Sequence, residues 1–93
     1  MATVQLTANG KRLEIKGDMT AQDVPDLLAS VRHYTGIEQI DLAGVGRVDS
    51  SALTVLLACS RASHGATVSV HQAPPALRAL SDLYGLQTLF WVV

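Results

Sequence analysis

Residues 37–53 read IEQIDLAGVGRVDSSAL, and this stretch decides the fold. Its first apolar residues indicate a strand that leads into a glycine-containing loop over residues 43–48. The motif Asp49-Ser50-Ser51 then supplies the residue types preferred at helix N-termini. The stretch therefore predicts a strand, a loop and a helix that runs to about His64, where Gly65 would stop it.

Upstream, the sequence predicts a hairpin and a helix. Asn9-Gly10 separates two segments in which apolar and polar residues alternate, a strong hairpin signal. After Gly17, apolar residues at i, i+3, i+4 and i+7 predict an amphipathic helix; they are Val24, Leu27, Leu28 and Val31. Thr20 with Asp23 resembles a capping box, but Pro25 lies in the first turn, so we expect an irregular helix start.

Downstream, the sequence predicts a strand over residues 67–70, a helix from Pro74-Pro75 to Gly85, and a short strand over residues 89–93. The order is ββαβαβαβ, and its helical crossovers demand parallel neighbouring strands. The predicted fold class is α/β, a sandwich of three helices on one mixed β-sheet of about five strands. Residues 1–93 are expected to form a single domain.

Composition restricts the function. The 93 residues are 48% hydrophobic and 16% charged, with a net charge of -1, so the chain lacks the basic field that nucleic-acid binding requires. No apolar run is long enough to cross a bilayer, so we expect no direct membrane insertion. The lone Cys59 can form no internal disulfide and no signal peptide is evident, so we expect a cytoplasmic protein.

Catalytic, metal and cofactor signatures are absent from the sequence. The histidines, His33, His64 and His71, share no ligand spacing, and Cys59 has no neighbouring base. Gly44-x-Gly46-x-x-Asp49 resembles a dinucleotide fingerprint, but Asp49 stands where a third glycine is needed and would repel a pyrophosphate. We therefore expect no catalytic residue, no metal and no cofactor, and predict a protein that is not an enzyme.

The start of the second helix has two interpretations. In the structural one, Asp49 or Ser50 caps the helix, which contributes about 1 kcal/mol. In the functional one, a serine hydroxyl at this positive helix end carries a phosphate or meets a carboxylate of a partner. Spacing alone favours the structural interpretation.

The second helix also suggests a docking surface. If Leu53, Leu56, Leu57 and Ser60 face the sheet, a small apolar face that begins at Ser51 is left outside, with Val55, Ala58 and Ala62 on it and Cys59 beside it. We expect Val55 and Ala58 to be exposed in the free protein and to contact a partner. The alternative is a helix that is merely rich in alanine.

Together these features resemble the STAS domain family. The resemblance rests on the element order, the strand before a glycine-containing loop, and Val48-Asp49-Ser50-Ser51-Ala52-Leu53 at a helix start. The family includes anti-sigma-factor antagonists, which a kinase anti-sigma factor phosphorylates on the second serine of an Asp-Ser-Ser-Gly motif. The resemblance makes Ser51 the candidate phospho-acceptor, with Ser50 beside it, although Ala52 replaces the glycine.

One branch of the family is more similar, the small STAS subunits of Mla phospholipid transporters (MlaB-like), which maintain outer-membrane lipid asymmetry. Arg47-Val48-Asp49-Ser50, the N-terminal hairpin and the segment 80–86 carry this resemblance. It implies a cytoplasmic subunit, peripheral to the inner membrane, that binds an MlaF-like ABC transporter ATPase through the hydroxyl after the motif aspartate. An anti-sigma-factor kinase is the alternative partner. The expected partner-binding residues are Asp49, Ser50, Ser51, Thr54, Val55 and Ala58.

Overall fold

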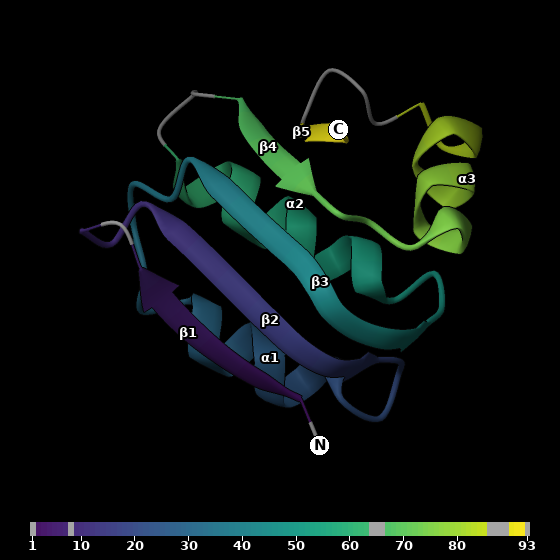
Figure 1. Ribbon diagram of the computed structural model, residues 1–93, viewed down its shortest axis with the longest axis horizontal. Coiled ribbons are helices and arrows are strands. Elements are labelled where there is room, and N and C mark those ends of the chain that lie inside the picture. The colour runs from purple at the N-terminus through teal and green to yellow at the C-terminus, as the bar shows by residue number, and fades with distance from the viewer. Residues whose placement is uncertain (1, 8, 64–66, 86–89, 93) are drawn as a thin grey trace.

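The computed structural model describes residues 2–7, 9–63, 67–85 and 90–92 of the chain. The strands are β1 (Thr3–Thr7), β2 (Arg12–Met19), β3 (Gln39–Val48), β4 (Val68–His71) and β5 (Phe90–Val92). The helices are α1 (Val24–Val31), α2 (Ala52–Ala62) and α3 (Pro75–Leu83). The chain follows the predicted order ββαβαβαβ, and its strands form one five-stranded sheet in the order β1-β2-β3-β4-β5 (Figure 1).

The sheet is mixed, as predicted. β1 and β2 are antiparallel, whereas β2, β3, β4 and β5 are parallel to one another. Asn9 and Gly10 both have positive φ, 61° and 84°, and lie between Thr7 and Arg12, the last residues that pair across the hairpin. The Gly10 amide donates to the Thr7 carbonyl at 3.1 Å, which closes the turn. The hairpin predicted from Asn9-Gly10 is therefore confirmed.

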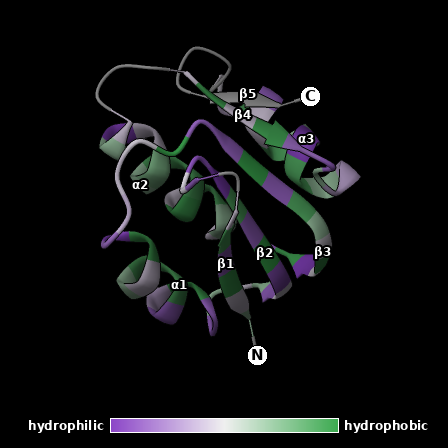
Figure 2. Ribbon diagram, turned by 60° about the vertical axis from the view of Figure 1, so that its left-hand side comes forward, coloured by the Kyte–Doolittle hydropathy of each residue, from purple (hydrophilic) through white to green (hydrophobic). Residues whose placement is uncertain are grey.

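The helices cover one face of the sheet. Figure 1 shows α1 and α2 behind the strands, with α3 beyond the end of β4. The strands alternate, so one set of side chains faces these helices and is almost completely buried; it includes Leu13, Ile15, Ile40, Leu42, Val68 and Val70. Figure 2 shows the same alternation as hydrophobic and hydrophilic bands along β2 and β3. The core thus lies between the sheet and the helices, and polar residues occupy the other face.

Residues 43–48 are strand, so the loop predicted there is wrong. This segment continues β3 along β2, where Lys16 pairs with Gly44 and Met19 with Val48. The register of β2 shifts at two points near Gly17, which has a φ of 97°. A Cβ at Gly44 would lie 2.7 Å from Cγ of Lys16. The glycines therefore mark close approach within a bulged strand pair, which sequence inspection mistakes for a turn.

The helix boundaries agree with prediction to within a few residues. α1 begins at Val24 after a turn over residues 21–23, which is the irregular start expected from Pro25. Asp23 makes no side-chain cap, although its carboxylate accepts a 3.1 Å hydrogen bond from the Thr20 hydroxyl. α2 ends at Ala62, and His64, Gly65, Leu89 and Val93 lie outside the described residues. Across the described parts of the chain, no helix combines the length and apolar character needed to span a bilayer.

Candidate functional site

Asp49 organises the start of α2. Its Oδ1 accepts hydrogen bonds from the Ser51 amide, at 2.9 Å, and from the Ser51 hydroxyl. Its Oδ2 accepts a 3.0 Å hydrogen bond from the amide of Ala21, in the turn before α1. The Ser51 hydroxyl and then the two amides stabilise the charged form, so the pKa of Asp49 is lowered from its ordinary value of 3.8. The carboxylate therefore holds the starts of both helices together.

The two serines of the motif have different surroundings. Ser51, the N-cap residue of α2, is half-buried, and its hydroxyl is engaged by Asp49. Ser50 is exposed, and its hydroxyl has no hydrogen-bond partner among the described residues. Of the two residues that could cap the helix, Asp49 accepts a hydrogen bond from the Ser51 amide, whereas the Ser50 side chain accepts none. The exposed hydroxyl of Ser50 is therefore free to contact another molecule.

The predicted facing of α2 is right for Leu53 and Leu56, which are buried, but wrong for Val55 and Cys59. Val55 is 0% exposed and Cys59 is 2% exposed, so both belong to the core rather than to an outer face. The outward residues are Thr54 and Arg61, which are exposed, and Leu57 and Ala58, which are half-buried. The true outer face is rotated from the predicted one by roughly the 100° that separates consecutive residues. The reason is that the buried stripe includes Ala52, Val55, Leu56 and Cys59, at the i, i+3, i+4 and i+7 spacing, whereas the prediction placed Leu57 and Ser60 on the buried side.

A groove runs between α1 and α2. It has a volume of about 500 Å³ and is lined by Leu28, Val31, Arg32, Thr54, Leu57, Ala58, Arg61 and Ala62. Two predicted partner-binding residues, Thr54 and Ala58, therefore lie on this surface. Ser50 is exposed as well, but it lies just before the N-cap residue of α2 and does not line the groove. The structure thus brings Thr54 and Ala58 together in one groove, leaves Ser50 exposed before the helix, and removes buried Val55 from the candidate site.

A second hollow, of about 400 Å³, lies where the two helices begin, and Asp18, Asp23, Arg47 and Asp49 are among its lining residues. The sequence did not indicate that Asp18 lies near the Asp49-Ser50-Ser51 motif. Asp18 is on β2 and the motif follows β3, and no local pattern predicts a contact between neighbouring strands. Asp18 accepts a 2.9 Å hydrogen bond from the Arg47 amide, and the other two carboxylates also accept hydrogen bonds. Within the described ranges, no group of three or more metal-ligating side chains could hold an ion.

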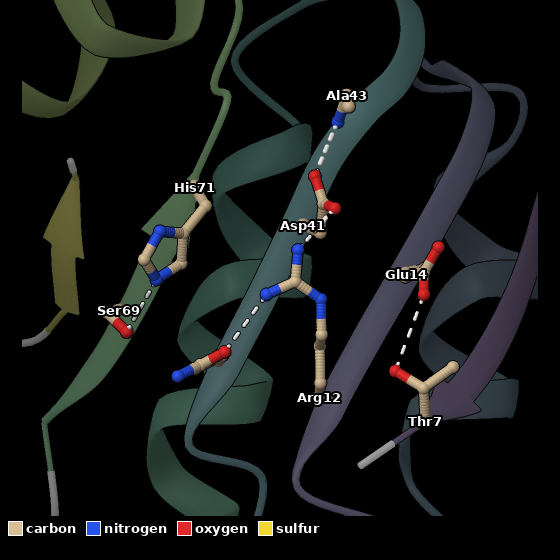
Figure 3. A network of polar contacts seen from close by, with 8 residues as sticks. Thr7, Arg12, Glu14, Asp41, Ala43, Ser69 and His71 are labelled. Atoms are coloured by element: carbon tan, nitrogen blue, oxygen red, sulfur yellow. Dashed lines mark hydrogen bonds and ion pairs between the residues drawn. The ribbon is translucent and has the colours of Figure 1, made fainter.

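The open face of the sheet carries paired polar side chains (Figure 3). Arg12 donates to Asp41 at 2.6 Å and to Gln39 at 3.0 Å, and the Thr7 hydroxyl donates to Glu14 at 3.4 Å. The Ala43 amide, followed by Arg12, lowers the pKa of Asp41. These residues pair with one another, so this face has the character of an ordinary solvated surface.

The histidines and the cysteine considered in the sequence analysis form no catalytic arrangement among the described residues. His33 is exposed, and Nε2 of half-buried His71 lies 3.1 Å from the Ser69 hydroxyl. The predicted position of His64 in the last turn of the second helix lies outside the described residues. Burial raises the pKa of the Cys59 thiol to about 12, so this thiol is poorly suited to act as a nucleophile.

Comparison with known proteins defines the family. A family model described as an Mlab-type STAS domain matches residues 2–92. The chain is a STAS domain. A solved structure of the anti-sigma factor antagonist SpoIIAA in its unphosphorylated form is similar to this STAS domain, with a TM-score of 0.69 and 14% sequence identity over 100% of this chain and 87% of that one. At this identity the likeness demonstrates a shared fold. Among curated proteins, no sequence matches the chain.

Proposed function

We propose that this STAS domain is a non-enzymatic subunit that binds and stabilises the ATPase of an Mla-type phospholipid ABC transporter. The observation that carries the proposal is the match of the MlaB-like family model to residues 2–92. In this role the subunit lies in the cytoplasm, peripheral to the inner membrane, and serves the maintenance of outer-membrane lipid asymmetry. It contributes a binding surface and no chemical step.

The geometry of α2 supports a binding role. Ser50 offers an exposed hydroxyl with no partner in the described chain, and exposed Thr54 and half-buried Ala58 follow along the helix. The only charged side chain on α2 is Arg61, in its last turn. A surface with so little charge loses little hydration when it is covered. Binding only the folded ATPase would then stabilise that subunit by mass action.

A second candidate function is an anti-sigma-factor antagonist switched by phosphorylation. The SpoIIAA-like fold and the serine pair at a helix start favour it. Against it, the Ser51 hydroxyl is half-buried and donates to Asp49. A phosphate on Ser51 would break this hydrogen bond and place two or nearly two negative charges beside the carboxylate. Ser50, in contrast, is accessible to a kinase.

Affinity purification from the native host, in mild detergent, tests the two candidates. The transporter proposal expects an ABC ATPase and its membrane partners to be recovered with the tagged chain. Recovery of a kinase anti-sigma factor, together with a phosphorylated serine found by mass spectrometry, would instead establish the antagonist function. Thr3→Glu is a suitable control, because Thr3 is exposed and pairs with Lys16 on β2, so the variant should recover the same proteins.

A further inference from the structure

The helices α1 and α2 each connect two neighbouring parallel strands, so they run in the same direction, and they lie on one side of the sheet (Figure 1). The hydrogen bond from the Ala21 amide to Asp49 holds their N-terminal ends together. Arg32, the C-cap residue of α1, and Arg61, in the last turn of α2, line the same groove. The two C-terminal ends are therefore also neighbours, and each contributes a guanidinium group.

The groove combines apolar walls with unpaired positive charge. Leu28, Leu57 and Ala58 are half-buried hydrophobic residues that line it. Arg32 and Arg61 are exposed, and neither forms an ion pair with a carboxylate within the described ranges. Each guanidinium compensates the dipole of its own helix, but that leaves its hydrogen-bond donors unused. An occupant with carboxylates at this end would pair with both.

The groove suits a helix better than an extended segment. An extended peptide brings backbone groups that need hydrogen-bond partners, whereas a helix satisfies its own. Thr54 is the only hydroxyl residue among those that line the groove, and this hydroxyl already donates to the Ser51 carbonyl. Side chains of a third helix can pack between two neighbouring helices by the usual ridge-and-groove fit.

We propose that the α1–α2 groove holds one amphipathic helix of the partner, with an acidic first turn over Arg32 and Arg61. The inference rests on the proposed function, since that helix belongs to the transporter ATPase. Acidic residues are favoured in the first turn of a helix, so the partner helix runs antiparallel to α1 and α2. Its apolar stripe covers Leu28, Leu57 and Ala58.

Two synthetic peptides, each held helical by a side-chain cross-link, test the chemistry of the groove. Both carry leucines at i, i+3, i+4 and i+7, and they differ only in having two glutamates or two lysines in the first turn. At low ionic strength, fluorescence anisotropy should show that the glutamate peptide binds the full chain about fivefold more tightly or better. Amide NMR shifts should move at Leu57 and Ala58.

Variants of the chain make the test specific. The double variant Arg32→Glu/Arg61→Glu should reverse the preference, so that the lysine peptide binds more tightly. Arg78→Glu is the matched control, because Arg78 is exposed on α3 and does not line the groove, and it should keep the wild-type preference. An unchanged preference in the double variant would overturn the inference. A dimer of the chain, detected by light scattering and closed to both peptides, would also overturn it.

Recovery of the ATPase with the wild type and with the double variant distinguishes failure of the groove inference from failure of the proposed function. If the ATPase is recovered equally well with the double variant, the function stands and the groove inference fails. If no ATPase is recovered but the peptides behave as expected, the function fails and the groove remains a site for an acidic helix.

Discussion

Asp49 links the start of α2 to a residue 28 positions earlier in the chain. One carboxylate oxygen accepts a hydrogen bond from the Ser51 amide, and the other accepts one from the Ala21 amide. Its folded-state pKa is lowered, so the unfolded chain binds a proton more readily. The stabilisation from Asp49 is therefore complete above the ordinary pKa of 3.8 and is lost as the pH falls through the lower, folded-state value.

Replacing Asp49 with asparagine should destabilise the domain at neutral pH and weaken its dependence on acid. Asparagine lacks the charge and one of the acceptor oxygens, so at least one of these hydrogen bonds is lost. Urea unfolding at several pH values between about 5 and 3 should show a smaller loss of stability in Asp49→Asn than in the wild type. Equal losses would mean that the carboxylate contributes nothing through its charge.

Ser50 separates a structural role from a binding role. Its side chain is exposed and caps no amide, so Ser50→Ala and Ser50→Asp should each change the free energy of unfolding by less than about 0.5 kcal/mol. Binding should respond differently, because a charge at an interface loses its hydration when the partner docks. We expect Ser50→Asp to recover much less ATPase while its melting temperature stays the same.

The effect of Ser50→Asp on ATPase recovery needs a control variant that is folded and carries an added negative charge away from α2. Thr3→Glu adds the same charge on β1 and should leave ATPase recovery unchanged. Normal recovery with well-folded Ser50→Asp would exclude Ser50 from the interface.

At the scale of elements, α2 has a core side and an outer side that substitution should distinguish. Val55→Glu places a carboxylate at a position with 0% exposure and should cost more than about 4 kcal/mol, enough to unfold much of the population. Ala58→Glu lies at the groove and should leave the isolated domain folded while it abolishes partner binding. Circular dichroism with thermal unfolding, followed by purification of the complex, measures both effects.

A folded Val55→Glu domain would contradict the observed facing of α2. An unfolded Ala58→Glu domain would show that Ala58 is more tightly packed than its half-buried position indicates, and Thr54→Glu would then replace it as the test of binding.

Local sequence patterns predicted the elements whose cause is local. Asn9-Gly10 predicts the hairpin because these residue types adopt the positive φ that both have in this connection, and the strand and helix order follows from periodicity. The facing of α2 was missed because this helix is apolar on more than one side, and the prediction did not select the stripe that is buried, which includes Ala52, Val55, Leu56 and Cys59. The strand over residues 43–48 was missed because its glycines serve contacts with Lys16 and Asp18 on β2. The same holds for the candidate site: the local motif singles out Ser50, which is exposed, whereas no local pattern indicates that Arg32 lines a groove with α2.

At the scale of the whole molecule, Cys59 reports on global unfolding. It is the single cysteine of the chain, it is 2% exposed, and burial raises its pKa to about 12. The thiolate is the reactive form, so a thiol reagent near pH 8 should label the native protein very slowly. Labelling should accelerate with urea in parallel with the unfolding transition.

A destabilised variant gives the control for this measurement. Val55→Glu should be labelled rapidly without urea, because its core is open. Rapid labelling of the wild type under native conditions would mean that α2 detaches from the sheet without global unfolding.

The spatial order of the strands repeats their order along the chain, and this bears on synthesis. Each strand after the first hydrogen-bonds to the strand made just before it, so no strand has to insert between two others. A chain emerging from the ribosome can therefore extend the sheet one strand at a time, at a single growing edge. Contacts between strands that are consecutive in the chain also cost less chain entropy to form than contacts between distant strands. The same geometry sets a hazard: until β5 arrives, the edge of β4 is exposed and can capture a strand from a neighbouring nascent chain.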